Sequence, residues 1–383
     1  MELSVVMPCL NEADTVGVCI QKAQQAMASH RIEGEVIIAD NGSSDGSARI
    51  AEQLGARVVH VRDKGYGHAL MGGIAAARGE YVLMGDADDS YDFLELPKFV
   101  ERLRGGFDLV QGCRLPAGGG QLAEGSMPWS HRWIGNPIFS WLARHWFRAP
   151  IHDVYCGLRA FRRGHFLRLD LRCTGMEFAP EMIIKSSLYR AKIAEVPITL
   201  HRDGRKARGS HLRTLRDGWR TLRFLLIYSP RHLLLTPGIV LLLVGLAGYG
   251  VAMPGVSLWG VTFDAHTLLF SSLALICGYQ SVLFALLTKI FAINEGLLPP
   301  DPKVEAFSRL VSVERGLLAG GLGMVFGLAL LGLAVNQWRL AHFGRLDYAE
   351  TMRLVIPGST LTTLGFQSVL ASFVRSLLYL SRR

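Results

Sequence analysis

Two aspartates one residue apart, Asp86 and Asp88, directly follow a short apolar segment at residues 80–84. In an extended backbone such side chains point to the same side, so both carboxylates can reach one ion. Carboxylates this close repel one another unless a cation lies between them. Oxygen ligands favour a hard divalent cation, and magnesium or manganese usually arrives at such a site with a substrate's phosphates. The spacing therefore predicts a Mg²⁺ or Mn²⁺ site, against the simpler alternative of a solvated acidic turn.

Alternating strands and helices are predicted to position these aspartates. Strands are expected at residues 3–8, 35–39, 57–61, 81–84 and 109–112, and helices are expected to open near 11–12 and to cover 47–54, 69–78 and 94–103. This alternation predicts an α/β domain whose mostly parallel sheet carries helices on both faces. Ligands bind beyond the carboxyl ends of such strands. Polar clusters follow four of these strands, at residues 8–12, 40–45, 63–67 and 86–89. We therefore expect them to meet at one edge of the sheet.

The glycine-rich segment at residues 65–73 argues against two common nucleotide-binding motifs. It does not match G-x-G-x-x-G, and G-x-x-x-x-G-K-[ST] occurs nowhere in the chain. A nicotinamide-dependent dehydrogenase and a P-loop NTPase are therefore disfavoured. The glycines would still let the backbone approach a phosphate or a sugar closely.

The second half of the chain has the composition of a membrane protein. Half of the 383 residues are hydrophobic and the mean hydropathy is +0.25, an excess concentrated after residue 228. Four segments are apolar and long enough to cross a bilayer; they cover residues 233–253, 267–290, 317–335 and 355–380. Small residues in the third segment and directly before it could pack helices together and support a homo-oligomer; they are Gly316, Gly320, Gly323 and Gly327.

Basic residues near the spans predict the side of the membrane on which the first half lies. Residues 202–231 contain nine Lys or Arg against two Asp, and the loop after the second span is also basic, whereas the connection between the third and fourth spans is mixed. Basic loops stay in the cytosol, so we expect the first half there. Because the basic stretch adjoins a span, anionic headgroups or phosphate substrates are expected partners rather than nucleic acid.

An ordered set of motifs runs from residue 5 to about residue 223. It comprises M-P-C-L-N-E at 7–12, D-N-G-S-S-D-G at 40–46, K-G-Y-G at 64–67, D-A-D at 86–88, D-L-V-x-G-x-R at 108–114, Arg132, D-x-x-x-G-x-R at 153–159 and Glu177. Together these motifs closely resemble the GT-A fold glycosyltransferases of family 2, specifically the dolichyl- or polyprenyl-phosphate sugar synthases. The four spans look like those of the glucosyltransferase-type members.

The resemblance implies roles for the polar residues of these motifs. It places Asp86 and Asp88 at a metal and a diphosphate, and Arg114 and Arg132 at a lipid phosphate. The residues expected at the nucleotide sugar are Pro8, Asn11, Glu12, Asp40, Asp45, Lys64, Asp86 and Glu177. A carboxylate such as that of Asp40 accepts hydrogen bonds from a base or ribose, and a guanidinium fork binds two phosphate oxygens at once.

Asp153, Arg202 and Arg205 extend this assignment. Transfer to a hydroxyl group needs a general base, but a lipid phosphate is already ionised, so Asp153 is expected to orient the acceptor or the sugar hydroxyls. The catalytic candidates are then Asp88, Asp153, Arg114 and Arg132. Arg202 and Arg205, with Lys206, follow a strand and could close over the phosphates of the lipid. Glu177 and Glu181 are expected to bind sugar or to cap a helix, and His68 and His152 to be structural.

These expectations combine into three segments and one reaction. Residues 1–211 form the catalytic GT-A domain, 212–231 an amphipathic interfacial helix with its linker, and 232–383 the transmembrane domain. The expected reaction is an inverting transfer of a hexose from UDP-glucose, or next GDP-mannose, to polyprenyl or dolichyl phosphate at the cytosolic face. Two alternatives stay open: a processive polysaccharide synthase, although Arg132-Trp133 lacks the Gln of a Q-x-x-R-W motif, and a non-catalytic membrane scaffold, which has no need of mutually repelling carboxylates.

Overall fold

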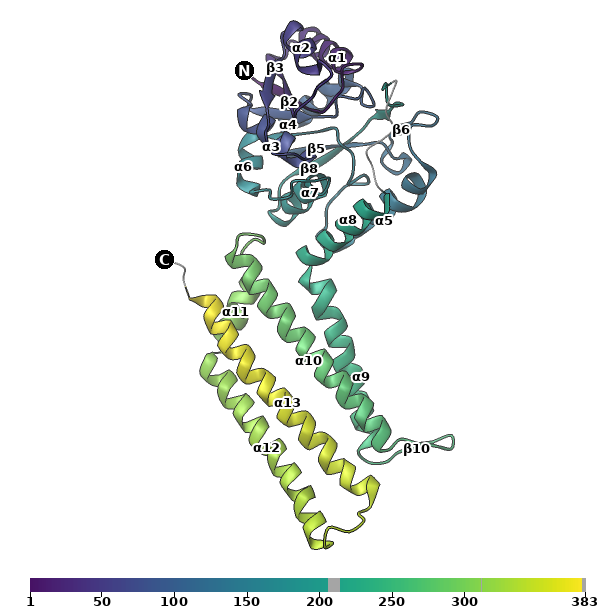
Figure 1. Ribbon diagram of the computed structural model, residues 1–383, viewed down its shortest axis with the longest axis vertical. Coiled ribbons are helices and arrows are strands. Elements are labelled where there is room, and N and C mark those ends of the chain that lie inside the picture. Colours follow the sequence, from purple (N-terminus) through teal and green to yellow (C-terminus); the bar gives the residue numbers. More distant parts are fainter. Residues whose placement is uncertain (206–213, 311, 381–383) are drawn as a thin grey trace. The chain divides into compact units, whose positions relative to one another are not determined.

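A computed structural model describes residues 1–205, 214–310 and 312–380 (Figure 1). The chain divides into two compact units, Met1–Leu225 and Leu226–Arg383. The division falls within helix α8 (Thr214–Tyr228), which covers most of the segment predicted to be an amphipathic helix. The predicted domain limit at residues 211 and 212 lies outside the described residues.

A seven-stranded sheet in the order β3-β2-β1-β4-β7-β5-β8 forms the centre of the first unit. Its strands are β1 (Leu3–Cys9), β2 (Gly34–Asp40), β3 (Arg57–His60), β4 (Tyr81–Met84), β5 (Leu109–Cys113), β7 (Arg159–Arg162) and β8 (Ile193–Pro197). Neighbouring strands are parallel except where β7 pairs with β4 and with β5. The predicted α/β unit with a mostly parallel sheet is therefore confirmed.

The reversed direction of β7 decides which residues reach the carboxyl edge of the sheet. Met84, at the end of β4, pairs with Arg159, at the start of β7. The segment that precedes β7 therefore lies beside the segment that follows β4. A Cβ on Gly157, in this preceding segment, would lie 2.9 Å from the carboxylate of Asp86.

Helices cover both faces of this sheet (Figure 1). Side chains of a strand alternate in direction, so Val5 and Met7 of β1 pack into a core with α1 and α4, whereas Val6 packs into a second core with α3 and α7. The helices of this unit before α8 are α1 (Val16–Ser29), α2 (Ser47–Gln53), α3 (Tyr66–Ala76), α4 (Leu96–Arg104), α5 (Asn136–Phe147), α6 (Arg163–Leu169) and α7 (Phe178–Leu188).

Helix α1 begins at Val16, later than the predicted start near residues 11–12. Asn11 has a φ of +61°, which is incompatible with a right-handed helix. The carbonyl oxygen of Glu12 accepts the N–H groups of Thr15 (3.1 Å) and Val16 (2.9 Å) and so closes a turn. This turn presents Asn11 and Glu12 at the edge of the sheet before the helix starts.

Among the described residues of the second unit, four helices are long and apolar enough to cross a membrane. They are Arg231–Ala252, made of a short π-helical turn η4 (Arg231–Leu235) and α9 (Thr236–Ala252), and then α10 (Ala265–Asn294), α12 (Val313–Leu340) and α13 (Tyr348–Tyr379). A hairpin of β10 (Ser257–Leu258) and β11 (Val261–Thr262) follows α9, and α11 (Pro302–Leu310) precedes α12. The prediction of four spans is therefore confirmed, and the helices extend past most of the predicted limits because helical hydrogen bonding continues into the polar flanks.

Glycines let α12 and α13 pack backbone against backbone. A Cβ on Gly365 would lie 2.5 Å from the carbonyl oxygen of Gly320, and one on Gly327 would lie 2.6 Å from that of Gly358. Two of the α12 glycines that the sequence predicts to pack helices, Gly320 and Gly327, thus contact a helix of the same chain. A homo-oligomer through these helices stays a prediction.

Candidate functional site

Hydrogen bonds join the loops that follow β1 and β2 at the carboxyl edge of the sheet. The N–H of Asn11 donates to Ser43 Oγ (2.9 Å), and Asn11 Oδ1 accepts the N–H of Ser44 (2.8 Å). The N–H of Glu12 donates to Ser47 Oγ (2.8 Å). These loops line a pocket of about 290 Å³, whose residues are Asn11, Glu12, Ala13, Asp14, Ser44, Asp45 and Arg205.

Hydrogen bonds lower the pKa of two carboxylates at the end of β2, those of Asp40, its last residue, and of Asp45 in the loop that follows. Burial alone would raise the pKa of Asp40, but hydrogen bonds from Ser43 and His60 lower it below the ordinary aspartate value, with His60 Nδ1 3.2 Å from Asp40 Oδ2. Burial likewise opposes ionisation of Asp45, but hydrogen bonds, chiefly from Ser47, lower its pKa. Both carboxylates are therefore hydrogen-bond acceptors at neutral pH.

Lys64 and Pro8 lie at the same edge. Lys64 Nζ donates to the carbonyl oxygen of Asn41 (2.5 Å), which lies in the β2 loop. Pro8 pairs with Ala39, one residue before the end of β2. The structure thus brings Pro8, Asn11, Glu12, Asp40, Asp45 and Lys64 to one region, as the sequence leads us to expect of residues around one ligand.

The glycine turn after Lys64 packs against a later segment. The N–H of Gly67 donates to the carbonyl oxygen of Thr174 (2.9 Å), and a Cβ on Gly67 would lie 2.5 Å from that of Cys173. The Cα of Gly67 therefore faces the 173–174 backbone, and the close approach of a phosphate or a sugar to these glycines stays a prediction. The residue must be small because the 173–174 backbone lies against it.

Asp86 and Asp88 follow β4 and carry the electrostatic signature of a cation site. Asp86 Oδ1 accepts the hydroxyl of Tyr66 (3.0 Å), and Asp88 Oδ1 accepts the hydroxyl of Ser90 (2.6 Å). Burial and the neighbouring charge of Asp88 raise the pKa of Asp86 to about 7. A positive ion between the two side chains would offset their repulsion and so favour the ionised form of Asp86.

The donor atoms fit a hard divalent cation, since both side chains offer only oxygen. Within residues 1–205, 214–310 and 312–380, no group of three or more His, Cys, Asp or Glu side chains is arranged to ligate a metal. A cation held by Asp86 and Asp88 would therefore take further oxygens from water and from a phosphorylated ligand. Magnesium commonly binds in this way, through one or two carboxylates plus substrate phosphates.

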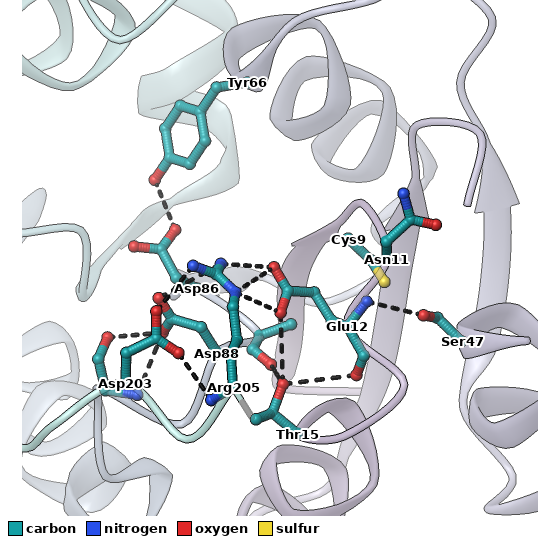
Figure 2. A network of polar contacts seen from close by, with 12 residues as sticks. Cys9, Asn11, Glu12, Thr15, Ser47, Tyr66, Asp86, Asp88, Asp203 and Arg205 are labelled. Carbon is teal, nitrogen blue, oxygen red and sulfur yellow. Dashed lines mark hydrogen bonds and ion pairs between the residues drawn. The ribbon is translucent and has the colours of Figure 1, made fainter. Parts of the chain in front are cut away.

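Arg205 lies among the carboxylates of this edge (Figure 2). Its Nε and Nη2 donate to the two carboxylate oxygens of Glu12 (2.8 and 2.5 Å), and Nη1 donates to Asp203 (2.8 Å). Its Nη2 lies 3.5 Å from Asp88 Oδ2. The sequence predicts Arg205 at a lipid phosphate, whereas in the structure its fork contacts protein carboxylates instead.

Arg202 lies in the same segment, and its side chain is exposed. A Cβ on Gly125 would meet the guanidinium of Arg202 at 2.7 Å, so this side chain lies against the 125 turn. Lys206, the third basic residue expected near the phosphates, lies outside the described residues.

Arg114 and Asp153 form a buried ion pair. Arg114 Nε and Nη2 donate to Asp153 Oδ2 (2.7 Å) and Oδ1 (2.9 Å), and the Arg114 N–H also donates to Asp153 Oδ2 (3.1 Å). Asp153 has no exposed surface and Arg114 is 8% exposed. The fork of Arg114, predicted to bind a phosphate, is thus already occupied by Asp153.

Glu195 supports this pair and was not predicted from the sequence. Its Oε1 accepts the N–H groups of His152 (2.7 Å) and Asp153 (3.1 Å), and its Oε2 lies 2.8 Å from His152 Nδ1. The expected structural role of His152 is consistent with this contact. Glu195 lies on β8, 42 residues after Asp153, and belongs to none of the motifs, so only the pairing of β8 with β5 brings it to Asp153.

Arg132 and Glu177 lie on other elements. Arg132 belongs to a π-helical turn, η3 (His131–Gly135); its guanidinium stacks over Trp133 at 5.1 Å from the ring centroid, and its buried Nε has no hydrogen-bond partner among the described residues. Glu177 makes no side-chain cap at the start of α7 and lies 3.7 Å from Arg220 of α8. In the part of the chain that the structure describes, no hydrogen bond or ion pair joins either residue to the Arg114–Asp153 pair.

Glu181 is structural. It is fully buried, accepts the N–H of Cys173 (2.7 Å), and lies 3.2 Å from the equally buried Lys185 one turn later. Of the two roles that the sequence leaves open, sugar binding or helix capping, Glu181 follows neither. It fixes the segment that packs against Gly67.

Comparisons with known proteins agree with the motif set. Residues 4–169 match the family described as Glycosyl transferase family 2, and residues 286–379 match the Glycosyltransferase family 2 C-terminal transmembrane region. The low-salt glycan biosynthesis hexosyltransferase Agl6 of Haloferax volcanii is 35% identical over 97% of this chain and 88% of its own. A dolichyl-phosphate hexose transferase of the same organism is 34% identical over 51% of this chain and 82% of its own. A crystal structure of glucosyl-3-phosphoglycerate synthase from Mycobacterium tuberculosis, with Mn²⁺ and UDP-glucose, is 23% identical, covers 59% of this chain and 78% of that chain, and has a TM-score of 0.46.

Proposed function

Because the chain belongs to glycosyltransferase family 2, we propose that it transfers a hexose from a nucleotide diphosphate sugar to polyprenyl or dolichyl phosphate. The chain is a multi-pass membrane protein and a hexosyltransferase, with a GT-A-like α/β unit followed by four apolar helices. The similarity to Agl6 along nearly the whole chain carries the hexosyl transfer, and the similarity to a dolichyl-phosphate hexose transferase over half of the chain supports the lipid-phosphate acceptor.

The donor is proposed to bind at the edge formed by the β1, β2 and β4 loops. Asp40 and Asp45 stay ionised there, which suits the N–H groups of a base and the hydroxyls of a ribose. Lys64 supplies a positive charge beside them. We propose UDP-glucose as the donor, with GDP-mannose next. The resemblance of the four spans to those of glucosyltransferase-type members of the family supports this order.

Asp86 and Asp88 are the proposed ligands of Mg²⁺ or Mn²⁺. When bound, such an ion supplies Lewis-acid stabilisation of the diphosphate leaving group. The protein's own part is to orient the two carboxylates, through the hydroxyl of Tyr66 on Asp86 and that of Ser90 on Asp88. Because these hydroxyls each donate one hydrogen bond, they leave the remaining oxygens of both side chains for other ligands.

The acceptor phosphate is ionised at neutral pH and has no proton to lose. One of its oxygens would form a bond to C1 of the hexose while the bond between C1 and the diphosphate oxygen breaks. The nucleoside diphosphate leaves, and the configuration at C1 inverts. This step needs no general base, which agrees with an Asp153 whose carboxylate is fully engaged by Arg114. Arg132 and Arg202 are the proposed contacts of the lipid phosphate, and the basic stretch supports a cytosolic site.

A transfer assay separates this proposal from its alternatives. Membranes containing the full chain are incubated with Mn²⁺ and labelled UDP-glucose or GDP-mannose, then extracted with organic solvent. Label in a lipid that mild acid cleaves supports the proposal. Insoluble labelled polymer would indicate a polysaccharide synthase, and no transfer from either donor would indicate a non-catalytic scaffold.

Matched variants connect the assay to the site. Asp88→Asn should abolish transfer. Asp92→Asn removes the same charge four residues later, where the side chain caps a short helix by accepting the N–H of Leu94 (3.1 Å) and lies 3.9 Å from Lys22. Because asparagine caps helices as well as aspartate does, Asp92→Asn should retain transfer. Equal activity of Asp88→Asn and the parent would contradict the site assignment.

A further inference from the structure

Arg205 forms ion pairs with carboxylates of the proposed donor site. Its guanidinium is the cation of the carboxylate cluster shown in Figure 2, in contact with Glu12, Asp88 and Asp203. The side chains of Arg205, Glu12 and Asp88 are only 15%, 7% and 15% exposed, so water screens these contacts weakly. Partly desolvated ion pairs of this kind are stronger than the surface pairs that contribute little.

The segment that carries Arg205 is hydrogen-bonded through its backbone to the loop that follows β4 and contains Asp86 and Asp88 (residues 85–90, the metal-motif loop). The N–H of His201 donates to the carbonyl oxygen of Ser90 (2.9 Å), and the N–H of Gly204 donates to that of Asp88 (3.0 Å). The N–H of Arg205 donates to Asp203 Oδ1 (2.9 Å). Two backbone hydrogen bonds therefore hold the segment on the loop after β4, and a third, within the segment, fixes the backbone at Arg205. Glu12 and Arg205 are 193 residues apart in the sequence, so their contact depends on the fold.

We propose that Arg205 is an internal counter-ion that occupies the carboxylates of the donor site before the donor binds, so that a divalent cation must compete with it. The inference rests on the proposed donor site, and it adds a competition that the proposed transfer does not require. A guanidinium 3.5 Å from Asp88 and a divalent ion on the same carboxylate would repel each other. One of them must move.

A nucleoside diphosphate changes the balance of this competition. A diphosphate offers a guanidinium the same bidentate partner that Glu12 offers now. Arg205 can then leave the carboxylates without losing its ion pair, and the cation can take its place. Cation binding should therefore be weak without nucleotide and strong with it.

The test measures Mn²⁺ binding directly. The full chain in detergent micelles is titrated with Mn²⁺ alone, and free Mn²⁺ is followed by its electron paramagnetic resonance signal. Arg205→Gln should bind Mn²⁺ about tenfold more tightly than the parent, a change that corresponds to about 1.4 kcal/mol. The matched control is Arg104→Gln, which removes the same charge and a similar fork, there on the carboxylate of Glu2 (2.7 and 2.7 Å), and it should bind Mn²⁺ like the parent. With UDP present, the difference between Arg205→Gln and the parent should shrink.

Arg205→Lys keeps the charge but loses the fork on Glu12, so it should tighten Mn²⁺ binding less than Arg205→Gln does. It also serves as the test if Arg205→Gln does not fold. Equal Mn²⁺ affinity of the parent and of a folded Arg205 variant overturns the inference, as does an equal gain in Arg104→Gln. Such results, with lipid-linked transfer intact in the parent, leave the proposed function standing. Absence of both transfer and Mn²⁺ binding with any nucleotide would refute the proposed function itself.

Discussion

The substitution Asp153→Asn tests whether the buried pair with Arg114 stabilises the first unit. Asp153 has no exposed surface and accepts three hydrogen bonds from Arg114, at 2.7, 2.9 and 3.1 Å. Asparagine keeps the shape but not the charge, so Arg114 would be left buried without a counter-charge. Removing one partner of a buried ion pair costs about 3–5 kcal/mol.

This free energy converts into a measurable shift of the melting temperature. The first unit, Met1–Leu225, is in the size range in which 1 kcal/mol corresponds to about 2–4 °C. Asp153→Asn should therefore lower the melting temperature of that unit by about 6–20 °C. The measurement is the intrinsic fluorescence of the purified full chain during heating, at one scan rate for all variants because unfolding of such proteins is commonly irreversible.

Two further variants make the result interpretable. Adding Arg114→Met to Asp153→Asn removes the unpaired charge and should recover part of the loss. Asp170→Asn breaks a pair with Arg172 whose side chains are 65% and 48% exposed, and it should shift melting by less than about 2 °C. If Asp153→Asn melts within about 2 °C of the parent and still abolishes transfer, the pair acts in the reaction and its stabilising role is refuted.

Three other outcomes follow from single contacts. Hydrogen bonds from Ser4 and Arg57, opposed by burial, lower the pKa of Glu35 below its ordinary 4.5, so its stabilisation is present above that value and lost as the pH falls through the lower folded value. The melting temperature of Glu35→Gln should therefore lie below that of the parent at pH 7, and the difference should shrink as the pH falls below 4.5; a constant difference would be inconsistent with this account. Gly67→Ala should lower the melting temperature of the first unit by several degrees, because its Cβ would lie 2.5 Å from a carbonyl oxygen, whereas Gly164→Ala meets nothing within 4 Å and should not; equal melting of the two would disprove the close approach. Gly365→Ala should weaken the packing of α12 on α13 and lower the melting temperature in detergent, and Gly321→Ala, which also meets nothing within 4 Å, is its control; an unchanged Gly365→Ala would argue against backbone contact there.

Much of the architecture could be predicted because its signals are local. The apolar strand β4 and the aspartates that follow it lie within ten residues, and each membrane span is a single continuous apolar stretch. Parallel strands end at the same edge of a sheet, so the meeting of the β1, β2 and β4 loops follows from the alternation of strands and helices. The position of Asp40 beside Asn11 and Lys64 needed no further information.

The rest depends on contacts between distant segments, which leave no local pattern. Arg205 lies on Glu12 because residues 201–204 bond to the metal-motif loop, and Glu195 reaches Asp153 because β8 pairs with β5. In a sequence, Arg114 is equally consistent with binding a phosphate and with pairing to a carboxylate. Only the fold shows that Asp153 already occupies its fork.

The reversed strand β7 has a consequence for synthesis on the ribosome. β5 leaves the ribosome before β7, yet in the finished sheet β7 lies between β4 and β5 and pairs with both. A nascent chain that has reached residue 150 therefore contains β4 and β5 but not yet β7. These two strands must not pair with each other, because β7 lies between them in the complete sheet. Direct pairing of β4 with β5 would exclude β7 and keep Asp153 from its place beside Arg114. Slow elongation through residues 114–158 would prolong exposure to this error, and a chaperone that shields the open edge would shorten it.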